Sequence, residues 1–239
     1  MTIIDTNFNF FSDTPIGKDP DSFSPTLRKY HGLLWSKKLP AGDLFRLNLE
    51  TPRLLHHKSD LGEFYLSSDA IGHTFKAFKK MSHIIENIPL AEVDDFFSIC
   101  CTIGAYIIFP SKRVDGKMTI NSARGCNQKI MDRFDLTLEC IRLHYLDEVS
   151  PLSDTLKRYS SFFSLFINFK DYVDFFLLQD LLIEGESQIK FWHPFGGFDK
   201  SPLPQNINDY HAYRLNVIDF IQSRNIRIEN NSKKGLTFS

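Results

Sequence analysis

The chain has 239 residues, with 28 Lys and Arg against 29 Asp and Glu, and 42% of its residues are hydrophobic. This composition is typical of a soluble globular protein and excludes an intrinsically disordered chain, which combines low hydrophobicity with high net charge. A formal net charge of −1 excludes a global attraction to nucleic acid or to anionic membranes. The chain is also rich in phenylalanine, with 23 Phe against 8 Tyr and 2 Trp.

The sequence predicts a cytoplasmic protein without a membrane partner. No basic segment followed by an apolar run occurs near the amino terminus, so no secretory signal is expected. Residues 100–109 form the longest apolar stretch, far short of the roughly 20 residues that a spanning helix needs. The cysteines form no CxxC pair and are interpreted as reduced thiols: Cys100, Cys101, Cys126 and Cys140.

In the first half of the chain, the local patterns predict one clear helix and several short strands. Ser24 and Pro25 are typical of an N-cap and a first helical position, so a helix is expected from there to about Trp35. The alternation of Phe45, Leu47 and Leu49 predicts a strand over residues 44–49. The further expected elements are a weaker strand over 63–67, a helix over 74–86, a buried strand over 103–109 and a hairpin turn at Asp115–Gly116.

The second half is predicted to be more helical. Helical spacing of apolar residues indicates a long helix over 128–146, capped by Asn127 and preceded by a polar loop over 121–125. Other expected elements are helices over 152–166, 171–183 and 208–224, a short strand over 189–195, and a flexible tail over about 230–239. We therefore predict a single α+β domain over residues 1–239, with short strands mainly in the first half and amphipathic and buried helices mainly in the second.

The expected helix over 128–146 is the main candidate for a functional site. It is apolar on two opposite faces, so its charged residues are confined to two narrow seams. The first seam carries three carboxylates and an arginine: Asp132, Asp135, Glu139 and Arg142. The second seam carries Arg133, Thr137 and His144. Charged groups in such a shielded position tend to have perturbed pKa values, and perturbed pKa values concentrate at functional sites.

A basic segment comes just before this expected helix. Arg124 and the free N–H groups at a helix start are suited to a phosphate or a carboxylate. The sequence therefore predicts a site for an anionic small molecule, phosphorylated or nucleotide-like, with no cofactor and no metal identified. The candidate catalytic residues are Asp132, Asp135 and Glu139, and the candidate ligand-binding residues are Arg124, Arg133, Arg142 and His144. The alternative is that these carboxylates form structural ion pairs with the arginines.

Two other classes of function are considered. A non-catalytic interaction module, such as a homodimer, a regulator or a phage-defence or toxin–antitoxin component, would use exposed phenylalanines around Gly196–Gly197. Four residues of this segment either shape a pocket or belong to the core: Phe191, His193, Phe195 and Phe198. A nucleic-acid binder is less favoured, because it rests only on local basic residues.

Three segments resemble an uncharacterised family of bacterial proteins. The central block is Asp132–Arg142 (DRFDLTLECIR), followed by His144 and Tyr145. Residues 19–31 and 172–181 resemble the same family, so the resemblance spans nearly the whole chain. It implies a bacterial, cytoplasmic, single-domain protein and carries no known activity.

Overall fold

Ser24 and Pro25 begin the first regular helix, as their order in the sequence predicts. In the computed structural model, which describes residues 4–51, 53–72 and 75–234, this helix is α2 (Pro25–Trp35). The Ser24 hydroxyl accepts a hydrogen bond from the Leu27 N–H at 3.1 Å and so satisfies one of the free donors at the helix start. Two short helical turns come before it, η1 (Phe10–Asp13) and α1 (Pro20–Phe23).

The described strands form two small antiparallel sheets. The larger has the order β3 (Leu55–Ser59), β4 (Gly62–Ala70) and β5 (Tyr106–Pro110), and the smaller pairs β1 (Lys37–Lys38) with β2 (Leu44–Phe45). Compared with the predictions, the strand over 44–49 shrinks to β2 and the strand over 63–67 grows into β4. The strand over 103–109 starts later, because a 3₁₀ turn, η2 (Ile103–Ala105), precedes β5.

The helix expected over residues 74–86 is divided in two. α3 (Phe75–Lys80) and α4 (Ser82–Ile85) take its place, and residue 74 lies outside the described residues. A further helix, α5 (Leu90–Cys100), was not predicted. Its buried residues, Val93, Phe96 and Cys100, have the three-and-four spacing of a helix, so the missed signal was present but short.

The helix expected over residues 128–146 is the largest correction. α7 runs only over Phe134–Tyr145, and α6 (Ile120–Cys126) occupies the segment where a loop was expected. Thr119 caps the start of α6, its hydroxyl accepting from the Ser122 N–H at 3.3 Å. Asn127 is the C-cap of α6, its backbone N–H donating to the Ala123 carbonyl oxygen, and not the N-cap of a following helix. Met131 and Asp132 have φ angles of 47° and 65°, and two such residues in succession are incompatible with a continuous right-handed helix.

The remaining segments keep their helical character but change their limits. The expected helix over 152–166 is divided into α8 (Ser153–Arg158) and α9 (Ser160–Phe163). The one over 171–183 becomes α10 (Phe169–Phe175) and the 3₁₀ turn η3 (Gln179–Leu181), separated at Leu177, where φ is 55°. In place of a strand over 189–195, the described residues form a single bridge between Leu182 and Ile189. Asp115–Gly116 forms a turn, but its described neighbours form no hairpin strands.

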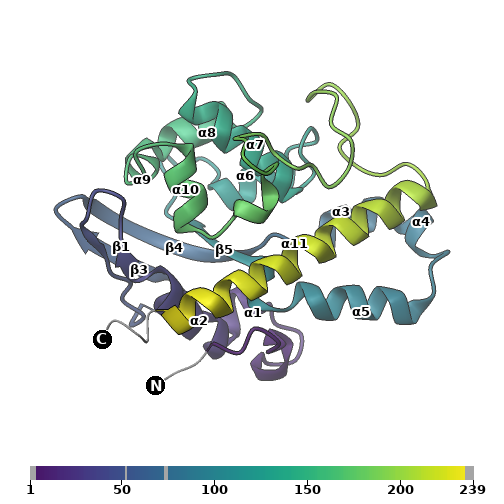
Figure 1. Ribbon diagram of the computed structural model, residues 1–239, viewed down its shortest axis with the longest axis horizontal. Helices are drawn as coiled ribbons and strands as arrows, with labels where there is room; N and C mark the ends of the chain where they lie inside the picture. Colours follow the sequence, from purple (N-terminus) through teal and green to yellow (C-terminus); the bar gives the residue numbers. More distant parts are fainter. Residues whose placement is uncertain (1–3, 52, 73–74, 235–239) are drawn as a thin grey trace.

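The last helix, α11 (Ile207–Lys234), begins where expected and continues well beyond residue 224. Residues 230–234 are therefore helical rather than frayed, and residues 235–239 lie outside the described part of the chain. Figure 1 shows α11 crossing the whole molecule, with α5 beside it and the group α6 to α10 on the other side of β4 and β5 from α2. None of the helices formed by the described residues is both long and apolar enough to cross a membrane.

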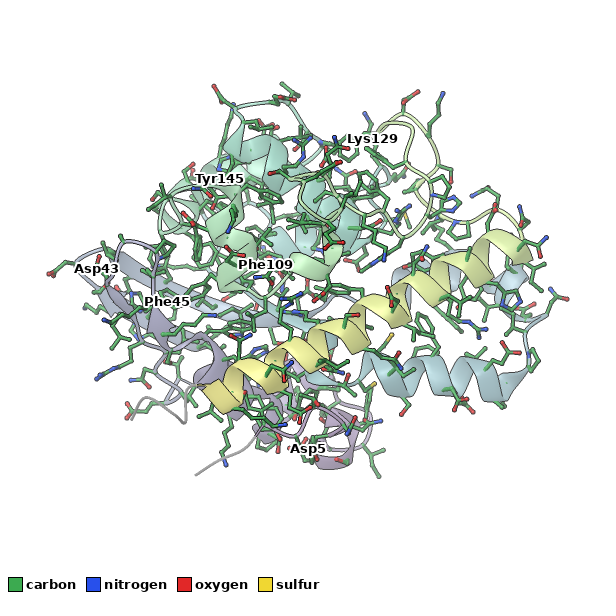
Figure 2. All side chains as sticks on the ribbon, viewed as in Figure 1. Asp5, Asp43, Phe45, Phe109, Lys129 and Tyr145 are labelled. Carbon is green, nitrogen blue, oxygen red and sulfur yellow. The ribbon has the colours of Figure 1, made fainter. Side chains whose placement is uncertain are left out.

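The phenylalanine surplus lies mainly in the core. Phe109 lies at the centre of the molecule, between the sheet and the helices above it (Figure 2), and is fully buried. Phe162, Phe166 and Phe176 pack on one another and on Tyr172 with ring centroids 4.9 to 6.5 Å apart. The observed architecture is an α+β fold with strands mainly in its first half, as predicted.

One buried histidine connects α2 with the sheet and makes the stability of the fold depend on pH. The indole N–H of Trp35 donates to His31 Nδ1 at 3.0 Å, so the imidazole carries its proton on Nε2 and donates it to the Ser68 hydroxyl at 2.9 Å. Burial lowers the pKa of His31 to about 3, with Arg224 and Arg28 adding to the shift. The unfolded chain therefore binds a proton that the folded chain excludes between pH 6.5 and 3.

We expect the free energy of unfolding to fall as the pH drops through this window, by up to about 4 kcal/mol from His31 alone. Replacing His31 by Gln removes the titrating group while keeping one donor for Ser68. In urea unfolding at pH 7, 5 and 4, the free energy of unfolding of this variant should fall less with decreasing pH than that of the parent chain. Parallel pH profiles of the two proteins would contradict the assignment.

Candidate functional site

The guanidinium of Arg124 lies at the centre of a group of carboxylates. Its Nη1 lies 2.5 Å from Asp69 Oδ2 and 3.1 Å from Asp132 Oδ1. Its Nη2 donates to the Asp132 carbonyl oxygen at 2.7 Å, and its Nε donates to the Thr137 hydroxyl at 3.1 Å. The Arg124 side chain is fully buried, so one cation is shared by two carboxylates away from bulk water.

The local backbone explains why these three residues meet. Side chains of α6 reach β4, with Arg124 pairing with Asp69 and Asn121 donating to Ser67. Ser67 and Asp69 share one face of the strand, and Ser68 points to the other. Asp132 has a left-handed conformation, and both its carbonyl oxygen and its carboxylate turn toward Arg124. The turn over residues 128–133 that breaks the expected helix therefore completes the ion-pair arrangement.

Two further residues complete what we call the Arg124 cluster: Arg124, Asp69, Asp132, Asp21 and Asn121. The Asn121 amide donates to the Ser67 hydroxyl at 3.2 Å and to the Ser68 carbonyl oxygen at 3.3 Å, but its Oδ1 is buried and accepts no hydrogen bond. Asp21 Oδ1 is likewise buried and accepts no hydrogen bond, although the Ser68 hydroxyl and the Ala70 N–H lie close enough to the Asp21 carboxylate to oppose the rise in its pKa. Buried polar atoms are almost always paired, so two unpaired acceptors in one cluster mark it as unsatisfied.

The carboxyl groups of Asp21 and Asp69 hold protons more tightly than usual. Burial raises the pKa of Asp21 well above its usual range, and the neighbouring charges of Asp69 and Asp19 raise it further. Burial also raises the pKa of Asp69 to about 6; Arg124 opposes this shift, and Asp132 adds to it. Carboxyl groups with separated pKa values are the arrangement from which enzymes draw an acid and a base.

The cluster is not sealed inside the protein. The side chains of Asp69 and Asp132 retain 20% and 14% of their exposure, whereas Arg124 beneath them has none. Solvent therefore reaches these two carboxylates from outside, and the arginine supports them from within. Among the residues that the structure describes, no group of three or more His, Cys, Asp or Glu side chains is arranged to hold a metal ion.

Arg133 and Asp135 form a separate ion pair below the surface. Both side chains are buried, and the Arg133 Nε donates to Asp135 Oδ1 at 3.0 Å. The Trp192 N–H donates to the same carboxylate at 2.9 Å, while Arg133 donates to the carbonyl oxygens of His193 and Pro202 at 3.1 and 2.5 Å. This pair therefore holds the long segment before α11 against the start of α7.

The other predicted residues on α7 lie apart from both groups. Arg142 donates to both carboxylate oxygens of Glu139, at 2.7 and 2.8 Å, in a partly exposed pair. His144 stacks edge-on against Phe163 with ring centroids 5.2 Å apart, and burial lowers its pKa. Of the seven predicted site residues, Arg124 and Asp132 meet in the Arg124 cluster, whereas Arg133–Asp135 and Glu139–Arg142 form two separate ion pairs. Asp132 precedes the helix instead of sharing a seam with Asp135 and Glu139.

Sequence reasoning missed Asp21, Asp69 and Asn121. Asp69 carried a weak signal, since it is a charged residue at the end of a strand whose flanking run is otherwise apolar or small. Asp21 and Asn121 lie in polar segments where nothing distinguishes them from solvated loop residues. Their role becomes visible only when α1, β4 and α6 converge.

The aromatic loop before α11 is half-buried. Phe195 contacts Phe191 and Phe198 at centroid distances of 4.6 and 4.9 Å, and all three pack against the core. The His193 carbonyl oxygen accepts from Arg133, and burial together with the Arg133 charge lowers the pKa of its imidazole. These rings therefore satisfy much of their apolar surface within the chain.

Comparison with known proteins returns a family but no function. Neither the curated proteins nor the solved structures include a significant match to this chain. One family model matches residues 4–228, a range that contains every residue of the Arg124 cluster and both ion pairs of α7. The chain therefore belongs to DUF6994, a family of unknown function.

Proposed function

We propose that this protein binds a small polar molecule at the Arg124 cluster and transfers a proton to or from it. The observation that carries the proposal is the pair of buried acceptors, Asp21 Oδ1 and Asn121 Oδ1, that lack donors beside a carboxyl group whose pKa is about 6. A ligand hydroxyl or amino group would supply the missing donors. Asp69 then serves as the base and the more strongly proton-binding Asp21 as the acid.

The charge balance favours a neutral ligand over a phosphorylated one. Three carboxyl groups surround a single guanidinium, and every nitrogen of Arg124 already donates to a protein oxygen. A phosphate would meet these carboxylates at close range, where like charges repel strongly. Arg124 is better suited to holding Asp69 and Asp132 in place than to binding an anion, which moves the sequence-based proposal from an anionic to a hydroxyl-bearing or amino-bearing ligand.

The rival proposal, docking of a partner or of a second copy through the aromatic loop, has less support. Exposed rings are the usual anchors of such surfaces, and Phe191, Phe195 and Phe198 are instead half-buried against one another. A bacterial cytoplasmic setting remains part of the proposal. Cys100, Cys101 and Cys140 are buried thiols that form no disulfide, which supports a reducing compartment.

A thermal-shift screen with matched variants tests this proposal. The panel pairs neutral sugars and nucleosides with their phosphorylated forms. We expect a neutral member to raise the melting temperature of the parent chain and to lose this effect in Asp69→Asn, because the amide cannot act as the proton acceptor. The stabilisation in the parent should strengthen as the pH rises through about 6, where Asp69 ionises.

Asp115→Asn is the matched control, since Asp115 lies in an exposed turn at a φ of 51° that asparagine tolerates. This variant should keep the full ligand response. Equal responses of Asp69→Asn and Asp115→Asn would overturn the proposal. So would a stronger response to the phosphorylated members than to the neutral ones.

A further inference from the structure

A second feature of the molecule, separate from the Arg124 cluster, has the size of a ligand site. A cleft of about 960 Å³ lies between α10, η3, the segment over residues 182–190 and α11. Ligand pockets in proteins usually measure about 300–1,000 Å³, so this cleft admits an organic molecule. None of the residues of the Arg124 cluster lines it. We call it the α10–α11 cleft.

The lining of the α10–α11 cleft carries an excess of negative charge. Three of its carboxylates are paired with cations: Asp174 with Lys170 at 2.5 Å, Asp180 with Arg227 at 2.7 Å, and Asp219 with Lys190 at 3.1 Å. Glu184 and Glu186 also line the cleft, and no ion pair joins either of them to another described residue. Both side chains are exposed, so their charges are available to a cationic ligand.

A buried acceptor in the cleft wall also lacks a donor. The amide nitrogen of Gln179 donates to Asp174 Oδ1 at 2.8 Å, and this bond fixes the orientation of the amide. The Gln179 Oε1 is buried and accepts no hydrogen bond. An unpaired buried acceptor is costly, and a donor on a bound ligand would remove that cost.

The rest of the wall is apolar. Phe169, Val173 and Leu182 line the cleft between the charged groups. A ligand that matches this lining combines a hydrocarbon chain with several N–H donors and positive charge. We propose that the α10–α11 cleft binds an aliphatic polyamine, whose ammonium groups pair with Glu184 and Glu186 and donate to Gln179 Oε1, and whose methylene chain packs on the apolar wall.

Calorimetric titration of the full chain with spermidine tests the proposal. Replacing Glu184 and Glu186 together by Gln should weaken spermidine binding about tenfold, since two ion pairs are lost. Gln179→Leu should weaken binding as well, because it removes the acceptor while retaining a side chain of similar size. Asp94→Asn with Asp95→Asn is the matched control, because it removes two exposed carboxylates of α5 that do not line the cleft.

The control variant should bind spermidine within twofold of the parent chain. Equal weakening in both double variants would overturn the proposal, since it would show that only net charge matters. Binding of Mg²⁺ with the same affinity and the same dependence on Glu184 and Glu186 would overturn it too, because the methylene chain would then contribute nothing. The Asp69→Asn variant should keep its spermidine affinity, which separates this inference from the function proposed for the Arg124 cluster.

Discussion

Replacing Asp135 by Ala is expected to lower the free energy of unfolding by about 3–5 kcal/mol. The Asp135 carboxylate is fully buried and pairs with the equally buried guanidinium of Arg133. The Asp135→Ala variant therefore retains a buried positive charge without its counter-ion, and the Trp192 N–H loses its acceptor. Both losses occur away from water, which cannot enter to compensate them.

Urea unfolding at pH 7 measures this effect, and Glu139→Ala is the matched control on the same helix. Glu139 pairs with the partly exposed Arg142, so its loss should cost only about 1 kcal/mol. A loss for Asp135→Ala as small as that of the control would contradict the structural role assigned to the buried pair. Near-parent stability combined with a loss of activity would instead favour the catalytic role that the sequence predicts.

Replacing Arg224 by Met is expected to lower the free energy of unfolding by about 3–4 kcal/mol. The Arg224 guanidinium is fully buried and donates to four carbonyl oxygens, those of Gly104, Tyr106, Phe176 and Leu177, at 2.9 to 3.1 Å. Burial also has a cost here, since it lowers the pKa of Arg224 to about 9. The Arg224→Met variant no longer carries the cost of burying a charge. The loss of four hydrogen bonds outweighs this gain, because each hydrogen bond to a charged group contributes about 1.5–3 kcal/mol.

Arg227→Met is the matched control for this prediction. It lies three residues further along α11, and its bidentate pair with Asp180 is partly exposed, so we expect a loss of at most about 1 kcal/mol. The measurement is again urea unfolding at pH 7. Similar losses in the two variants would show that the carbonyl cage around Arg224 does not anchor α11.

The Arg224 cage also explains how α11 becomes part of the fold. A Cβ atom on Gly104 would lie only 2.5 Å from the Ile221 carbonyl oxygen, so the backbone of α11 passes directly over η2. The Arg224 side chain bonds carbonyl groups at the start of β5 and just after the end of α10. The helix was expected from its apolar spacing, but its docking position depends on carbonyl groups more than 40 residues away in the sequence.

Helix limits were predictable where the signal was local. α2 begins at Ser24 because a hydroxyl and a proline at neighbouring positions suffice to start a helix. The prediction of a helix over 128–146 was wrong because the break in this segment depends on a tertiary contact. Its apolar spacing continues through residue 130, but Arg124 and Asp132 bond across a turn in which Met131 and Asp132 have positive φ angles. The spacing of apolar residues cannot reveal that the Asp132 carbonyl oxygen accepts a hydrogen bond from the Arg124 side chain instead of from a helix N–H.

The sequence by itself determined the α+β class, the distribution of strands and helices, and the presence of a phenylalanine-rich core, because these follow from composition and from periodicities of two and 3.6 residues. Tertiary structure alone decided which charges meet in the Arg124 cluster. Asp21, Asp69, Asn121 and Arg124 come from three separate elements, whereas the Arg133–Asp135 and Glu139–Arg142 pairs join residues two and three positions apart. Local spacing can suggest pairs of the second kind, whereas the cluster depends on positions that only long-range packing brings together.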